Sequence, residues 1–188
     1  KIGVLNQSSV SYCHAFSGVM GAMLYRQLMG LPYVELSASS VGGPVTGWRN
    51  AGAYIHDDLK QMTLGIASTA FVPMLTTNKN DCKPGWQADA VKYRVTEWKD
   101  VPPRDVLIQG SLLLSNHPVL VGLDYWSHAV ADFVLKDMNP SKKATDWTRY
   151  GSEFLNSWNS TWGNGGFGIR TGNKMLADAI YTIFQVTV

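Results

Sequence analysis

The chain has 188 residues, about the length of a single domain. Apolar residues make up 45% of it and charged residues only 16%, so it is too apolar to be intrinsically disordered. The net charge is +2 and the longest basic run is Lys142-Lys143, so no nucleic-acid partner is expected. Polar residues interrupt every apolar run well before the roughly 20 residues that a membrane span needs, so no membrane span is expected either.

The first half of the chain is expected to be mostly helical. Apolar residues recur at three- and four-residue steps over residues 12–28, with Ser11 as a candidate N-cap and Gly30 at the end. A second helix is predicted over about 48–62. A third is predicted from the Pro-Pro pair at 102–103 through residue 114.

After Pro118 the pattern changes to short runs of strand length, separated by turn-forming residues. The glycine-rich run at 163–166 is interpreted as a hairpin turn and not as a phosphate-binding loop, because no Gly-Lys-Ser/Thr ending follows it. Helices followed by strands, without βαβ alternation, favour an α+β fold with two layers or lobes and a site between them. The predicted strands are 119–123, 129–135, 153–157, 167–170 and 179–188.

Cys13 lies just inside the N-terminus of the first predicted helix. Unpaired backbone N–H groups and the helix dipole at such a position favour a thiolate, so Cys13 is a candidate nucleophile. A lone cysteine can equally be a small buried apolar residue. Cys82 is the only other cysteine, so a single disulfide between the two stays open, an oxidising compartment is not required and the localisation is unknown.

Three segments of the chain resemble the papain-like cysteine peptidases, in the order found in that family. The first, residues 6–17, has Gln7 six residues before Cys13 and Ala-Phe-Ser beginning two residues after it. The second reads Ser-His-Ala-Val at 127–130. The third reads Asn-Ser-Trp at 156–158, followed by Trp-Gly-Asn-Gly-Gly-Phe at 162–167.

The resemblance implies a papain-like α+β fold over residues 1–188, as a single peptidase domain. We expect a helical lobe over about 8–117 and a β-rich lobe over about 118–188 with the N-terminal segment, and an active-site cleft between the two lobes. Because the chain begins at Lys1 without an initiator Met, the resemblance also implies a zymogen with an upstream propeptide. A piece of a larger parent chain fits the same observation.

The family's chemistry implies that a polypeptide substrate is hydrolysed through a thioester acyl-enzyme. Cys13 is then the nucleophile, His128 the general base and later the general acid, and Asn156 the residue that orients the imidazole. Gln7 and the backbone N–H of Cys13 are the expected oxyanion donors. Trp158 is expected to shield the Asn–His bond from water. No metal or other cofactor is expected, since the sequence has no Cys-x-x-Cys or His-Glu-x-x-His motif.

The resemblance also suggests which residues line the substrate cleft. A glycine-rich stretch corresponds either to Gly42-Gly43 or, by spacing, to Gly47-Trp48. Gly122 and Trp126 fall near the pocket for the second substrate residue before the cleaved bond, and Trp126, if it points inward, would favour small side chains there. Ser127 stands where Asp or Asn often precedes the histidine and is a further expected substrate contact.

The chain departs from the family pattern at several positions. His14 stands where an aromatic residue, usually Trp, follows the nucleophile, and Val10 stands where many members have a disulfide-forming Cys. The segment between Leu135 and Gly151 is longer than is common. Two other functions therefore stay open: a papain-like structural or binding module without activity, and a peptidase of cell-wall peptide crosslinks.

Overall fold

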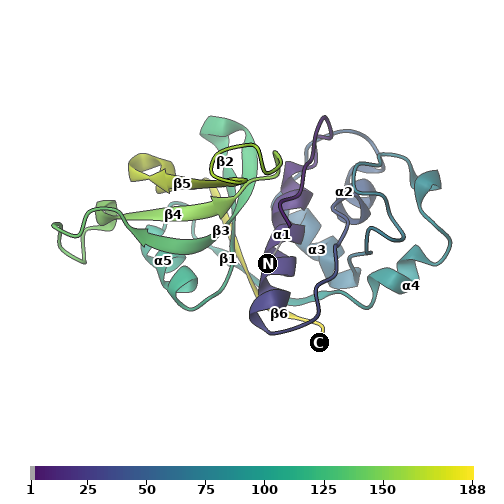
Figure 1. Ribbon diagram of the computed structural model, residues 1–188, viewed down its shortest axis with the longest axis horizontal. Helices are drawn as coiled ribbons and strands as arrows, with labels where there is room; N and C mark the ends of the chain where they lie inside the picture. The colour runs from purple at the N-terminus through teal and green to yellow at the C-terminus, as the bar shows by residue number, and fades with distance from the viewer. Residues whose placement is uncertain (1–2) are drawn as a thin grey trace.

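The computed structural model describes residues 3–188; Lys1 and Ile2, with which the expected domain begins, lie outside the described residues. Helices α2, α3 and α4 gather on one side of the molecule, a twisted sheet lies on the other together with α5, and α1 runs along the boundary (Figure 1). The helices are α1 (Cys13–Leu28), α2 (Ser39–Thr46), α3 (Ile55–Leu64), α4 (Trp86–Ala90) and α5 (Val106–Leu114). The strands are β1 (Val95–Val101), β2 (Val119–Leu123), β3 (His128–Asp137), β4 (Tyr150–Leu155), β5 (Phe167–Thr171) and β6 (Ala179–Val186).

The six strands form one antiparallel sheet in the order β1-β6-β2-β3-β4-β5. A short turn at 124–127 joins β2 to β3 and pairs Leu123 with His128. His128 is therefore the first residue of β3, at the end of the strand where the turn meets the helical side. The expected α+β fold is confirmed.

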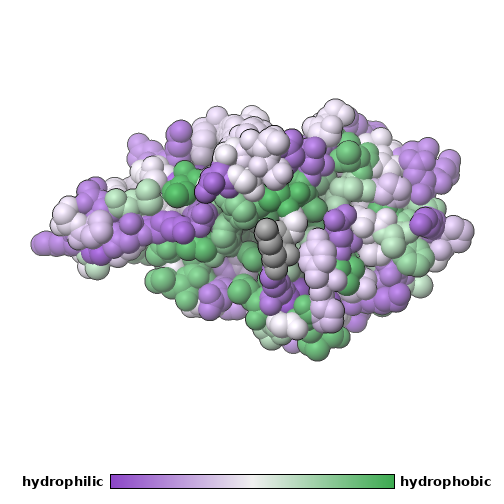
Figure 2. Space-filling model, in the orientation of Figure 1, coloured by the Kyte–Doolittle hydropathy of each residue, from purple (hydrophilic) through white to green (hydrophobic). Residues whose placement is uncertain are grey.

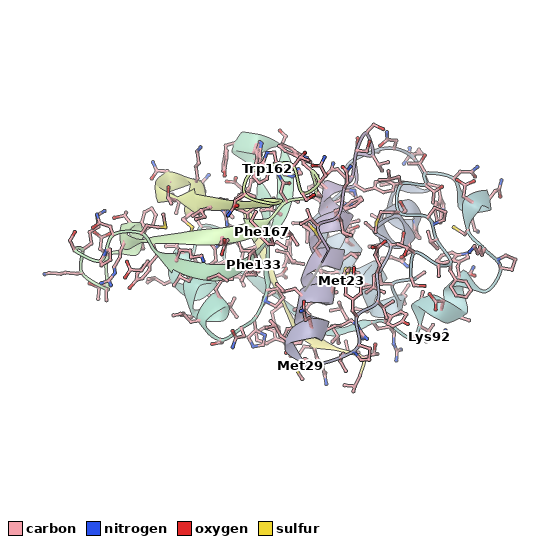
Figure 3. The ribbon with its side chains drawn as sticks, viewed as in Figure 1. Met23, Met29, Lys92, Phe133, Trp162 and Phe167 are labelled. Atoms are coloured by element: carbon pink, nitrogen blue, oxygen red, sulfur yellow. The ribbon has the colours of Figure 1, made fainter. Side chains whose placement is uncertain are left out.

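The helix α1 is the central packing element. It packs against α2 and α3 on one side and against β2, β3 and β6 on the other. Figure 3 shows Met23 on this helix and Phe133 and Phe167 on the part of the sheet beside it. The approach to the sheet is close at Gly21, where an added Cβ would lie 2.5 Å from the Leu120 Cδ2 atom. Burial of each large apolar side chain in this layer contributes about 1.5–3 kcal/mol, which fixes α1 relative to the sheet.

The prediction of a helix over 48–62 is wrong in its first half. An unpredicted helix, α2, ends before it at the left-handed Gly47, and α3 begins only at Ile55. The pattern missed α2 because Gly42, Gly43 and Pro44 are poor helix formers. Residues 50–54 form an irregular segment between the two helices.

The strand β1 was also missed, and it changes where the helical side ends. It pairs with β6 at the edge of the sheet, and α5 packs on β2 and β3. Residues 95–114 therefore lie with the sheet, although the expected helical lobe ran to about 117. Apart from the half-buried Trp98, the interior of β1 is exposed and mostly charged, as is usual for an edge strand, so it lacks the apolar signal of a buried strand.

The connection between β3 and β4 projects from the sheet, at the far end of β3 from His128 (Figure 1). Hydrophilic side chains cover the projection in Figure 2. Asp137 accepts two hydrogen bonds from the Arg149 guanidinium at its base. Within residues 3–188, no helix is long and apolar enough to cross a membrane.

Candidate active site

A cleft of about 400 Å³ lies where α1 meets the sheet. Four segments contribute to its walls: the first turn of α1, residues 52–55 before α3, the β2–β3 turn and the start of β6. Cys13 and His128, which are 115 positions apart in the sequence, line this same cleft. The other lining residues are His14, Gly52, Ala53, Tyr54, Ile55, Gly122, Leu123, Asp124, Ser127, Ala129, Asp178, Ala179 and Tyr181.

Cys13 is the first residue of α1 and is half-buried at the base of this cleft. Burial raises the pKa of its thiol above the ordinary value, and the negative charge of Asp58 acts in the same direction. Hydrogen bonds from the backbone at Ala129, at His14 and at Cys13 itself act to lower the pKa. The net direction is upward, so burial outweighs the helix N-terminus that favours the thiolate.

His128 is buried, with 8% of its surface exposed, and its Nε2 atom lies 2.7 Å from Oδ1 of Asn156. Burial lowers the pKa of the imidazole, while the bond to Asn156 acts to raise it. With the Asn156 oxygen as acceptor, the ring carries its proton on Nε2 and leaves the Nδ1 lone pair free to accept another proton. The backbone N–H of Ser157 donates to the same oxygen at 2.8 Å and holds the amide in this orientation.

Aromatic rings surround the imidazole on the side of the sheet. The Trp158 ring lies 4.7 Å from the His128 ring between centroids, with an angle of 33° between their planes. Trp126 lies 5.0 Å from His128 and also contacts Trp158 and Trp162. Trp158 therefore lies beside the imidazole whose Nε2 atom is bonded to Asn156.

Gln7 ties the N-terminal segment to the residues directly after β4, where Asn156 lies. Its side-chain Nε2 donates to the Val10 carbonyl at 3.1 Å, and its Oε1 accepts from the Ser157 hydroxyl. Its backbone N–H donates to the Ser157 carbonyl at 2.7 Å. An amide nitrogen has two hydrogens, so the bond to Val10 leaves one for another acceptor.

The residues expected to contact substrate are only partly brought together. Gly122 and Ser127 line the cleft, whereas Trp126 lines a separate hollow beside Trp162. The expected pair Gly47-Trp48 lies elsewhere, because a glycine turn directs Trp48 back onto α2 and against Trp86. Gly42-Gly43 is likewise packed inside the fold, against Tyr12 and Trp48.

Sequence reasoning missed Gly52, Ala53 and Tyr54, which form the cleft wall that was assigned to Gly47-Trp48. Gly52 lies on open backbone in this wall, since an added Cβ there would meet nothing within 4 Å. Asp124 and Asp178 were missed as well, and both line the cleft near the start of β6. No pattern identified them, because only the pairing of β2 with β6 brings them together.

Both cysteines, Cys13 and Cys82, are free. Among residues 3–188, no group of three or more His, Cys, Asp or Glu side chains is arranged to hold a metal ion.

No protein-family model matches the sequence, and no curated protein matches it. Solved structures do match. Digestive procathepsin L 3 of the Tenebrio molitor larval midgut has a TM-score of 0.76 and 16% identity, over 97% of this chain and 66% of that chain. This chain thus spans just under two thirds of the procathepsin chain.

Two other structures are similar over most of this chain. Bromelain from Ananas comosus, in complex with the E64 inhibitor, has a TM-score of 0.75 and 18% identity, over 98% of this chain and 94% of that one. A structure from work on the mite allergens Blo t 1 and Der p 1 has a TM-score of 0.76 and 16% identity, over 100% of this chain and 67% of that one. The chain therefore has the papain-like fold that its three sequence segments indicate.

Proposed function

We propose that this chain is a cysteine peptidase that hydrolyses peptide bonds with Cys13, His128 and Asn156, and that it forms a single papain-like peptidase domain. The observation that carries the proposal is the bond between His128 and Asn156 in a cleft that also contains Cys13. A buried imidazole with one nitrogen held by an amide oxygen and the other free has the geometry of a general base. The papain-like fold supports the same function.

The first half of the proposed reaction forms a thioester. The pKa directions favour a neutral thiol and a neutral imidazole in the free protein, so the proton leaves Cys13 as its sulfur attacks. The new S–C bond forms at the peptide carbonyl, the thiol proton moves to His128, and the carbonyl oxygen becomes an oxyanion. His128 then gives this proton to the leaving amine as the C–N bond breaks.

The second half restores the enzyme. His128 removes a proton from a water molecule whose oxygen attacks the thioester carbon, and the S–C bond breaks. The sulfur regains the proton from His128, and a carboxylic acid is released. Asn156 holds the ring at Nε2 in both halves, so that the same ring nitrogen exchanges the proton each time.

The oxyanion needs preformed hydrogen-bond donors in both halves. We propose the backbone N–H of Cys13 and the uncommitted amide hydrogen of Gln7 for this role. The hydrogen bond from the Ser157 hydroxyl to Gln7 supports this role, because Ser157 directly follows Asn156. The segment after β4 then holds both the oxyanion donor and the residue that orients the base.

The substrate is proposed to be an unfolded or extended polypeptide, and the procathepsin neighbour supports synthesis as a zymogen. In the cleft, Gly122 and Ser127 would contact substrate as first expected, and Gly52 and Ala53 replace Gly47 and Trp48 on the opposite wall.

Covalent labelling separates this proposal from an inactive papain-like module. The epoxide E-64 is incubated with the wild-type protein and with the Cys82→Ala and Cys13→Ala variants, and the adducts are located by mass spectrometry. We expect one adduct per chain at Cys13 in the wild type and in Cys82→Ala, and none in Cys13→Ala. A wild-type protein that stays unlabelled at Cys13 would support the module without activity.

A further inference from the structure

A buried pair of polar side chains lies directly behind the proposed nucleophile. His14 follows Cys13 in α1, and its Nδ1 atom lies 2.7 Å from Oδ2 of Asp58 in the first turn of α3. The two residues are only 2% and 0% exposed. This pair joins the two helices at the point where α1 presents its first turn to the cleft.

Joining two helices through a buried ionisable pair costs free energy. A buried carboxylate loses its hydration, and apolar side chains of similar volume are often at least as stabilising. The Nε2 atom of His14 and the Oδ1 atom of Asp58 are buried without a hydrogen-bond partner among the described residues. His14 also lines the cleft together with Cys13 and His128. These features indicate a role beyond packing.

The charges around the pair are few. On α3, Asp57 and His56 act on Asp58, and both are partly exposed. The helix α2 has no titratable side chain, and β2 has none either. The elements packed against α1 and α3 further contribute His128, Asp132, Lys136 and Asp137 from β3, Tyr181 from β6, and the exposed Glu97, Lys99 and Asp100 from β1. The Tyr12 ring lies 5.8 Å from the His14 ring between centroids.

Of these charges, Asp58 is the one that raises the pKa of Cys13. Burial raises the pKa of Asp58 itself, and the bond and the positive charge of His14 act against that rise. A protonated His14 makes the pair neutral overall, whereas a neutral His14 leaves the Asp58 charge to oppose the Cys13 thiolate. The charge of Asp58 is thus coupled to the ionisation of the thiol.

We infer that His14 and Asp58 are a positioning pair for Cys13, which fixes the first turn of α1 on α3 and sets the charge behind the sulfur. The inference rests on the proposed function, since it assigns the pair to that nucleophile. His14 offsets the Asp58 charge, and Asp58 holds the His14 ring through its Nδ1 atom. Both are positioning residues and do not touch the substrate carbonyl.

The test measures the rate of Cys13 alkylation by iodoacetamide against pH, with each cysteine followed separately by mass spectrometry. In Asp58→Asn the opposing charge is gone, so Cys13 should react about threefold faster or more at a pH below its midpoint. His14→Asn keeps an N–H near the position of Nδ1 but cannot be protonated, so Cys13 should react more slowly by a similar factor.

The chain provides matched controls. Asp57→Asn removes the same charge one residue earlier on α3, but Asp57 is 41% exposed, so its charge is screened and the Cys13 profile should not move. Cys82 lies away from the pair and is an internal reference whose alkylation should be the same in all variants. A common shift at both cysteines would report a general change in the fold and would count against the inference.

If Asp58→Asn and His14→Asn lower the melting temperature but leave the Cys13 profile unchanged, the pair is only structural and the inference is wrong. If either single variant fails to fold, His14→Gln or Asp58→Ser replaces it, and the expected direction of the change at Cys13 is the same. If the proposed function itself is wrong, the wild type and every variant will fail to hydrolyse peptides, while alkylation of Cys13 can still be measured. The two kinds of failure are therefore distinguishable.

Discussion

At the scale of single residues, burial has opposite consequences for the two proposed reacting groups. It raises the pKa of the Cys13 thiol and lowers the pKa of the His128 imidazole. Both shifts favour the neutral form of each group, because a low-dielectric site penalises charge. The proposed reaction thus begins with a proton on sulfur and an imidazole that is ready to take it.

The acid limit of activity should lie below the ordinary histidine value of about 6.5. His128 must be neutral to act as the base, and burial lowers its pKa, so it stays neutral to a lower pH. The Asn156 bond acts to raise this pKa, so Asn156→Ala should move the acid limit of kcat/KM further down while it lowers kcat. The measurement is the pH profile of kcat/KM on a peptide substrate. An acid limit above 6.5, or one that rises in Asn156→Ala, would contradict the assignment of His128.

Gln7→Ala should lower kcat by about a hundredfold, which corresponds to about 3 kcal/mol of barrier, if its amide is an oxyanion donor. Ser157→Ala is the control, since it removes only the hydroxyl that anchors Oε1 of Gln7 and keeps the donor. Its expected loss is below about tenfold. Steady-state kinetics on a single peptide substrate measure both effects, and equal rates for Gln7→Ala and wild type would remove Gln7 from the mechanism.

The sequence alone was enough to propose Cys13, His128 and Asn156, because the chemistry depends on residue type and on short flanking motifs. It was not enough for the opposite wall of the cleft. Trp48 was expected there and Trp126 near the pocket for the second substrate residue, but each packs into an aromatic group outside the cleft lining. The direction of a side chain depends on a turn or on neighbouring rings, which a residue pattern does not specify.

At the scale of elements, glycine positions show where backbone geometry is under constraint. Gly65 follows α3 with φ of 147°, and a Cβ there would lie 2.5 Å from the backbone C and O atoms of Ala90. Gly110 lies inside α5, and its added Cβ would meet only Leu135 at ordinary distances of 3.6 and 3.7 Å. The same substitution should therefore have opposite effects at the two sites.

Gly65→Ala should lower the free energy of unfolding by about 1–3 kcal/mol, because it combines a strained φ with a backbone clash. Gly110→Ala should raise it by about 0.5–1 kcal/mol, since alanine loses less entropy in a helix. Denaturant unfolding monitored by circular dichroism measures both. Equal stability of the two variants would contradict the strained φ and the close approach of Gly65 to Ala90 at the end of α3.

Elements with a strong apolar period were predicted well, and those without one were not. The first helix and the strand at 119–123 agree with α1 and β2 because their apolar residues are buried in a regular order. The edge strand β1 has an exposed interior, and α2 contains Pro44 and two glycines, so neither carried a signal. Packing against α1 and α3 stabilises α2 where its own propensity does not.

At the scale of the whole molecule, the cleft depends on how the helical side and the sheet meet. One face of α1 packs on the sheet and the other on α2 and α3, so the first turn of α1 and the first residue of β3 are fixed together (Figure 1). Motif order in the sequence indicated this fold, and similar solved structures confirm it. It could not be predicted that residues 95–114 lie with the sheet and not with the helical side, since their position depends on long-range strand pairing.

The projecting β3–β4 connection should be dispensable for catalysis. Its residues 138–149 follow the end of β3 that lies about 30 Å along the strand from His128, at about 3.3 Å per residue. Asp137 and Tyr150 are paired, so an Asn-Gly turn can replace the connection directly. We expect kcat/KM on a short peptide to stay within about twofold of wild type. A large loss in a variant with wild-type circular dichroism would instead assign substrate binding to the projection.

Hydrolysis of a denatured protein substrate tests the central claim most directly. Purified wild-type protein, Cys82→Ala and Cys13→Ala are compared by the release of new amino termini, with each variant confirmed as folded. The account predicts equal hydrolysis by wild type and Cys82→Ala and none by Cys13→Ala. Hydrolysis that persists in Cys13→Ala, or a folded wild type that releases no new termini from any polypeptide, would contradict it.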